Sequence, residues 1–150
     1  MNKPAWIIGF LFVLTQPALP VGQRVTVPPP GTPLRHELMN ALRLPVEKEL
    51  SQAIIFAVKT LKTSGDWSFG ELTPKRKDGQ RLTYTHTPYA EAVKAGIFDE
   101  GMCVLWYRHK GVWQVKTYVL GATDVPYGCW WKAFNAPKGI FTYTEKCCGD

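Results

Sequence analysis

The 150-residue chain has no apolar run as long as the roughly 18 residues of a transmembrane helix, which excludes a conventional membrane span. It has no repeat with a period of about 20 to 50 residues, which excludes solenoids and propellers. Nucleotide-binding loops, zinc signatures and a G-x-S-x-G elbow are also missing, so no catalytic motif points to an enzyme. What is present, 45% hydrophobic and 20% charged residues, is typical of a globular chain.

The N-terminus has the pattern of a secretory signal. Lys3 precedes a short apolar core from Trp6 to Leu14, and Pro17-Ala18 then interrupts the helix next to a small residue. We therefore predict a signal peptide over residues 1–22 and an exported chain, either periplasmic or secreted. The alternative is an uncleaved N-terminal anchor.

The sequence after residue 22 predicts a linker followed by one domain. Residues 23–31 contain three consecutive prolines and a glycine, a composition that favours an extended spacer. Residues 32–150 form the single predicted domain. It starts with apolar side chains at every fourth position from Leu34, which predict an amphipathic helix reaching Leu50. Pro45 predicts either a kink in this helix or two short helices.

Strand patterns follow this helix. Runs rich in β-branched and aromatic residues predict strands over residues 53–61, 67–72, 81–85, 102–108 and 112–120. Short helices are predicted over residues 89–95 and within 126–134. This order predicts an α+β fold in which the N-terminal helix packs on a curved antiparallel sheet, the architecture of cystatin-like and NTF2-like cones.

Three segments occur together along the chain: Ser64–Phe69, then Thr87–Tyr89 with Phe98–Gly101, then Leu120–Val125. In them the chain resembles a group of small exported bacterial proteins of unknown function, whose G-D-W-[AS]-F and A-T-D-V segments bracket the domain. The resemblance covers roughly residues 34–141. It implies the fold and export, and it brings no catalytic residues. The Cys129-Trp130-Trp131 run and the doubled cysteine near the C-terminus depart from the group.

Four cysteines, Cys103, Cys129, Cys147 and Cys148, follow the signal, and an even number in an exported chain predicts disulfides. Because a bond between adjacent Cys147 and Cys148 would strain the backbone, we expect each to pair with Cys103 or Cys129. Each bridge would stabilise the fold by about 3 to 4 kcal/mol. The alternative is a cysteine nucleophile or a metal site, which the absence of C-x-x-C and H-x-x-x-H disfavours. No metal and no cofactor are expected.

Asp66 and Asp124 each stand beside an apolar segment and are the candidate carboxylates of a polar cavity. A pair of carboxylates with one raised pKa could do general acid/base work there. The simpler interpretation is that Asp66 caps the turn before Trp67 and Asp124 caps a helical turn near Pro126.

Lys75, Arg76, Lys77 and Arg81 surround Asp78 on a predicted hairpin tip. Such a basic hairpin tip would attract an anionic polymer of the cell envelope. Export makes nucleic acid an unexpected partner. The alternative is a solvated loop that keeps an edge hairpin soluble.

Trp130 and Trp131 are adjacent and, with Tyr127 and Phe134, could stack on a sugar or a peptide. The alternative is that they close the open end of a curved sheet.

These features predict a non-enzymatic, exported module that binds a partner at the bacterial cell envelope, either an anionic polymer or another exported protein. The alternatives are a small NTF2-like enzyme that uses Asp66 or Asp124 in a cavity, and an inhibitor or immunity-type protein that blocks a secreted enzyme with a protruding loop. A cavity with a polar group of perturbed pKa would favour the enzyme, and an exposed apolar patch would favour the inhibitor.

Overall fold

A computed structural model describes residues 24–147, so the predicted signal peptide and Cys148 lie outside the described residues. The first described helix is α1 (Pro33–Leu50), and a C-terminal segment, residues 122–147, follows the last strand. The strands are β1 (Ile54–Ser64), β2 (Trp67–Arg76), β3 (Asp99–His109) and β4 (Val112–Gly121). The short helices are α2 (Ala90–Lys94), α3 (Trp130–Ala133) and the 3-10 turn η1 (Lys138–Ile140).

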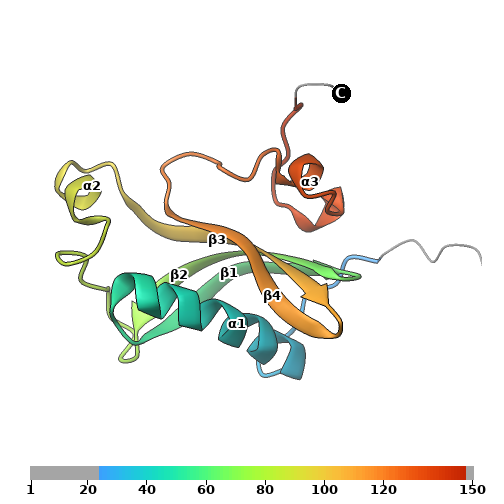
Figure 1. Ribbon diagram of the computed structural model, residues 1–150, viewed down its shortest axis with the longest axis horizontal. Helices are drawn as coiled ribbons and strands as arrows, with labels where there is room; N and C mark the ends of the chain where they lie inside the picture. Colours follow the sequence, from blue (N-terminus) through green and yellow to red (C-terminus); the bar gives the residue numbers. More distant parts are fainter. Residues whose placement is uncertain (1–23, 148–150) are drawn as a thin grey trace, which may run out of the picture.

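The four strands form one open antiparallel sheet in the order β1-β2-β3-β4. Helix α1 lies along one face of this sheet, and the C-terminal segment with α3 covers part of the opposite face (Figure 1). The predicted α+β fold, with the N-terminal helix packed on a curved antiparallel sheet, is confirmed. None of the described helices is long and apolar enough to cross a membrane.

Each face of the sheet carries its own hydrophobic core, because side chains along a strand alternate between faces. In β2, Leu72 belongs to the core beneath α1, whereas Phe69 belongs to the core beneath the C-terminal segment. In β3, Trp106 and Leu105 divide in the same way. The sheet is therefore a central layer, and side chains fill the space between it and α1.

Helix α1 is held to the sheet by the apolar stripe that the sequence predicts. Leu38, Leu42 and Val46 are fully buried, and they recur every four residues on one side of the helix. The helix is continuous through Pro45, so the alternative of two short helices is wrong. Burial of Leu42 and Val46 on either side of the proline offsets the cost of about 3 kcal/mol that a proline inside a helix carries.

Residues 81–85 do not form the predicted strand. The Asp-Gly turn does form, since the amide of Gly79 donates to the carbonyl of Arg76. The chain then leaves the sheet, and the side-chain amide of Gln52 hydrogen-bonds both backbone groups of Thr83 in place of a neighbouring strand. Leu82 and Tyr84 turn into the core beneath α1, which explains why this stretch alternates like a strand.

The Pro-rich segment ahead of α1 contacts the sheet. Thr26 exchanges two backbone hydrogen bonds of 2.8 Å with Thr63 at the end of β1. Further pairing stops at Pro28, because prolines have no amide hydrogen to donate. The carbonyl of Pro28 instead accepts a hydrogen bond from the guanidinium of Arg35 in α1.

Glu49 joins three parts of the fold. Its carboxylate accepts hydrogen bonds from the hydroxyls of Tyr89, next to α2, and Tyr118, in β4. Burial raises the pKa of both tyrosines above the usual value, and the hydrogen bond to Glu49 raises it further, so both hydroxyls keep their protons to donate.

We expect Glu49→Gln to lower the free energy of unfolding by about 1 to 2 kcal/mol, since an amide has one acceptor atom where the carboxylate has two. Chemical denaturation measures this loss. Glu91→Gln is the matched control, because Glu91 is exposed and pairs only with Lys94 among the described residues. Equal stability of the two variants would contradict the role of Glu49.

Candidate functional site

A cleft of about 310 Å³ opens between the sheet and the start of the C-terminal segment, on the face opposite α1. We call it the acidic cleft. Its polar lining consists of Lys59, Glu71, Thr73, Asp99, Thr123, Asp124 and Tyr127. Its apolar lining includes Leu72, Met102, Val119 and Val125.

Strand register brings the cleft residues together. Glu71 of β2 lies opposite Cys103 of β3, and Asp99 lies opposite Gly121 at the end of β4. Gly121 has a positive φ of 88°, and a Cβ at this position would collide with the ring of Phe98. Glycine thus lets the chain turn away from β4 and form the wall of the cleft.

Two of the three segments that carry the resemblance meet at this cleft. Asp99 and Gly101 come from one, and residues 122–125 come from the other. The third segment, around Asp66, lies at the opposite end of the sheet, next to the β3–β4 turn. The cleft is therefore built by segments that are distant in sequence.

The cleft has an excess of negative charge, with three carboxylates against one ammonium. One oxygen of Asp99 accepts a 2.6 Å hydrogen bond from the amide of Gly101. Asp124 and Lys59 form no side-chain hydrogen bond or ion pair with any other described residue. These two charged groups are thus available to a ligand.

Glu71 belongs to a hydrogen-bonded chain at the inner end of the cleft. The hydroxyl of Tyr127 donates to Glu71 Oε1 at 2.9 Å and lies 2.7 Å from the hydroxyl of Thr142. Burial raises the pKa of Tyr127, so this hydroxyl stays protonated and fixes the orientation of Glu71. The carboxylate is thereby held in place to accept a second hydrogen bond from a ligand.

Cys103 lines the same cleft as a free, buried thiol. Burial raises its pKa to about 12, which keeps it protonated and unsuited to nucleophilic attack at neutral pH. The expected bridge from Cys103 to Cys147 does not form, because Cys147 is bonded to Cys129 and Cys103 is buried among core residues beneath the C-terminal segment. Cys148, the other expected partner, lies outside the described residues.

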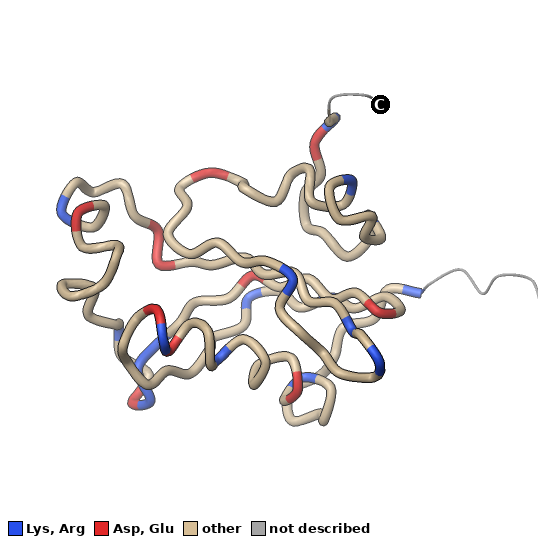
Figure 2. The backbone as a smooth tube through the Cα atoms, viewed as in Figure 1, with Lys and Arg blue, Asp and Glu red and all other residues tan. Residues whose placement is uncertain are grey.

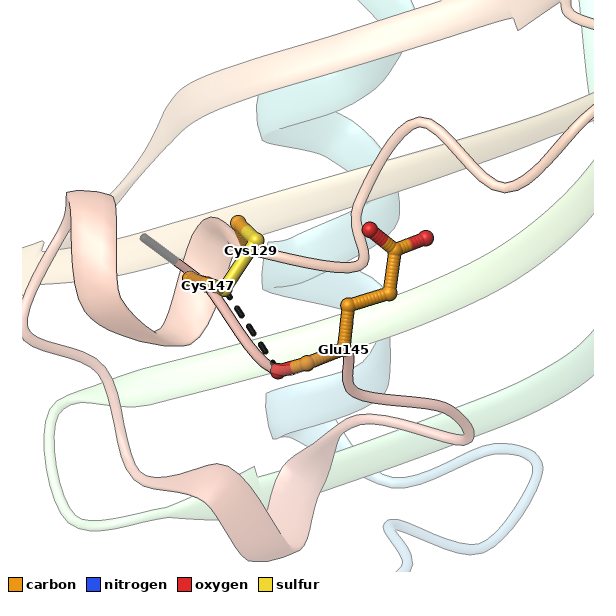
Figure 3. Close-up of a disulfide and its surroundings, with 3 residues drawn as sticks. All are labelled: Cys129, Glu145 and Cys147. Atoms are coloured by element: carbon orange, nitrogen blue, oxygen red, sulfur yellow. Dashed lines mark hydrogen bonds between the residues drawn. A yellow bond between two sulfur atoms is a disulfide. The ribbon is translucent and has the colours of Figure 1, made fainter. Parts of the chain in front are cut away.

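Cys129 and Cys147 form a disulfide, which is one of the pairings expected from the sequence. Figure 3 shows this bond beside Glu145, whose amide donates to the carbonyl of Gly128 at 2.9 Å. A Cβ on Gly128 would lie 2.6 Å from the Glu145 carboxyl carbon, so glycine permits the close passage of the tail. The bridge ties the end of the chain to α3.

Asp66 and Asp124 do not share a site. Asp66 forms a 2.8 Å ion pair with Arg108 at the β1–β2 turn, and its carbonyl accepts a hydrogen bond from the amide of Arg108. Asp124 lies in the acidic cleft. Neither predicted cap forms among the described residues: the Asp66 carboxylate pairs with Arg108 of β3 instead, and the Asp124 side chain makes no hydrogen bond to the turn at residues 126–129.

The basic hairpin tip is partly neutralised. Arg76 pairs with Asp78 at 2.8 Å, and Arg81 pairs with Glu100 at 2.7 Å. Lys75 and Lys77 form no ion pair with the other described residues. Basic residues are otherwise scattered along the whole described chain rather than gathered in one patch (Figure 2).

Trp130 and Trp131 pack in the core beneath the C-terminal segment. Trp130 makes edge contacts with Tyr127 and Phe134, with 6.2 Å between ring centroids in each pair. The ammonium of Lys138 lies 3.7 Å above the ring of Trp131. Both indoles are half-buried, so they help to close this face of the sheet.

Lys59, Glu71 and Asp99 were not predicted as site residues, and Tyr127 was predicted only as part of a stacking surface with Trp130 and Trp131. In the sequence, each of these looks like an ordinary polar residue of a strand or loop. The pairing of β2 with β3 is what brings them together in the fold. Glu71 is the one acidic residue in β2, and an acidic side chain within a predicted strand is the sequence feature that could have pointed to this site. In the described part of the chain, no group of three or more His, Cys, Asp or Glu side chains is arranged to hold a metal ion.

No protein-family model, no curated protein and no solved structure matches this chain.

Proposed function

We propose that this protein is an exported, non-enzymatic binding module of the bacterial cell envelope, and that it holds another exported protein by a lysine or arginine side chain inserted into the acidic cleft. The observation that carries the proposal is the negative balance of the cleft in a chain whose net charge is +6. A basic side chain would be attracted to this cleft and repelled by most of the surface.

The dimensions and chemistry of the cleft suit such a side chain. Val119 and Val125 offer apolar surface to the methylene groups of a lysine or arginine. Glu71 and Asp124 offer acceptors for its charged end, and hydrogen bonds between charged groups are stronger than neutral ones. Lys59 at the cleft would disfavour a ligand with more than one positive charge.

Export is supported by two features. The pattern of residues 1–22 is that of a signal peptide, and the Cys129–Cys147 bridge is the kind of bond that persists in oxidising compartments. A binding rather than catalytic role is supported by the protonated Cys103 thiol and by the side chains of α1 that fill the space on its face of the sheet.

The test is an NMR titration of the protein with Nα-acetyl-arginine amide, with the neutral citrulline analogue as the matched ligand. We expect shifts at Glu71, Asp99 and residues 122–125 with the arginine ligand, and weaker shifts with citrulline. Asp124→Asn should weaken arginine binding about threefold to tenfold, since it removes one partly exposed ionic contact. Asp78→Asn, which removes a carboxylate outside the cleft, should leave it unchanged.

The basic hairpin tip supplies the competing outcome. Binding of arginine that is insensitive to Asp124→Asn would overturn the proposal. The proposal would also be overturned if arginine did not bind and the protein were instead retained on an anionic polymer. That retention should then be lost when four basic residues are replaced by glutamine: Lys75, Arg76, Lys77 and Arg81. Turnover of a substrate that Asp124→Asn or Glu71→Gln abolishes in a folded protein would replace binding by catalysis.

A further inference from the structure

A second concave surface lies at the opposite end of the sheet from the acidic cleft. It is an open groove of about 490 Å³, lined by Trp67, Tyr107, Lys116, Ala133, Phe134 and Asn135. We call it the aromatic groove. Half of these residues are aromatic, which is unusual for exposed surface on a globular domain.

The rings of the groove come from two layers. Trp67 of β2 and Tyr107 of β3 are neighbours in the sheet, with ring centroids 4.7 Å apart, and so make one continuous aromatic surface. Phe134 faces this groove from the C-terminal segment, just after α3. All three side chains are half-buried, so part of each ring remains accessible.

The wall that carries Phe134 has a fixed shape. The amide of Ala136 donates to the carbonyl of Trp131 at 2.9 Å, which closes the turn after α3. Asn135 occupies the left-handed region with a φ of 53°, a conformation that asparagine tolerates better than most residues. A groove with a preformed wall binds at a lower entropic cost than one that must be ordered by its ligand.

The charge of the aromatic groove is opposite to that of the acidic cleft. Lys116 is its one ionised residue, and no carboxylate occurs among the described residues that line it. The ammonium of Lys116 lies over the Phe134 ring, 5.6 Å from its centroid, so the positive charge stands next to the aromatic lining of the groove. Lys132 is exposed on α3, immediately before the lining residue Ala133.

We propose that the aromatic groove binds an acidic glycan, with the apolar face of a sugar ring stacked on the aromatic side chains and its carboxylate paired with Lys116. Flat aromatic rings match the C–H face of a pyranose, while Tyr107 and Asn135 can hydrogen-bond its hydroxyls. An acidic peptide would gain the charge contact but little from the rings. This site is independent of the proposed function of the acidic cleft.

The test uses two probes with the same sugar backbone, the anionic tetragalacturonate and its neutral methyl ester, with NMR shifts of the Trp67 indole N–H and of residues 133–135 as the readout. We expect the acid to bind more tightly than the ester at low salt and to lose that advantage at high salt. Lys116→Gln should lower affinity for the acid about threefold and leave affinity for the ester unchanged. Its matched control, Lys77→Gln, should change neither.

Phe134→Leu removes the ring but keeps an apolar side chain, so it should lower affinity for both probes about fivefold. Tyr143→Leu is its control, because Tyr143 is exposed on the same segment outside the groove. Absence of binding, shifts elsewhere, or equal binding by the parent and Phe134→Leu would overturn the proposal. Penta-aspartate that binds as well as tetragalacturonate would also overturn it, in favour of an acidic peptide.

The same titrations on Asp124→Asn separate the two sites. Glycan binding that persists in this variant, with arginine binding reduced, supports both proposals. Glycan binding that falls along with arginine binding would overturn the independence of the aromatic groove.

Discussion

Replacement of Trp106 by alanine is expected to lower the free energy of unfolding by about 3 to 5 kcal/mol, the range for removal of a large buried aromatic side chain. Trp106 is the largest fully buried side chain in the described part of the chain, and it lies in the core between β3 and α1. A loss of this size is a large share of the stability of a small domain, so the variant will be partly unfolded at physiological temperature.

The fit between Trp106 and Gly70 sharpens this prediction. A Cβ on Gly70 would lie 3.0 Å from Cζ3 and 3.1 Å from Cη2 of Trp106, closer than most contacts in a packed interior. Trp106→Phe removes both atoms, and it also removes an indole N–H that has no hydrogen-bond partner among the described residues. We therefore expect Trp106→Phe to cost only about 1 to 2 kcal/mol.

A double-mutant cycle measures the coupling. Gly70→Ala should destabilise the parent protein but cost less in the Trp106→Phe background, because the ring that it would contact has been shortened. Chemical denaturation of the four proteins gives the coupling energy. Additive effects would mean that Gly70 is required for its backbone freedom, or because an added Cβ would lie 3.3 Å from the Thr60 carbonyl oxygen, rather than for Trp106.

The parts of the fold that are local in sequence could be predicted from it. The four-residue repeat from Leu34 to Val46 identifies α1, since the same side chains that define the period are those that are buried. The two hairpins follow from alternation and tight turns. Residues 81–85 have the same alternation but no strand partner, because the tertiary contact with Gln52 satisfies their backbone instead.

The acidic cleft could be predicted only in part. Asp124 was one of two candidate cavity carboxylates, beside the simpler capping interpretation, but its pairing with Asp66 was wrong because strand register places the two at opposite ends of the sheet. Glu71 and Asp99 join the site through the pairing of β2 with β3 and of β3 with β4. Periodicity gives the face on which a side chain lies but not its neighbour across the ladder.

The cysteines show the same limit. An even number of cysteines beside the pattern of a secretory signal predicts bridges, and Cys129–Cys147 forms. Cys103 has the sequence context of the other cysteines, yet β3 directs it into a core. Pairing depends on the distance between side chains in the folded chain, which spacing along the sequence does not determine.

The double variant Cys129→Ser/Cys147→Ser is expected to lose about 3 kcal/mol of stability, the value that the chain-entropy model gives for cysteines 18 residues apart. Both cysteines are replaced so that neither can pair with Cys103. Because the bridge holds the segment that supplies Phe141 and Tyr127, the loss should be concentrated on the face opposite α1. Hydrogen exchange should therefore accelerate in residues 126–147 before it does in α1.

The acidic cleft should weaken along with the bridge. Tyr127 fixes Glu71, and it is held from the other side by Thr142, five residues before Cys147. A freed tail releases this chain of hydrogen bonds, so arginine binding should fall in the double variant although no cleft residue has changed. A reducing agent should reproduce both losses in the parent protein and add nothing in the variant. Unchanged stability and binding after reduction would mean that the two cores hold the C-terminal segment without the bridge.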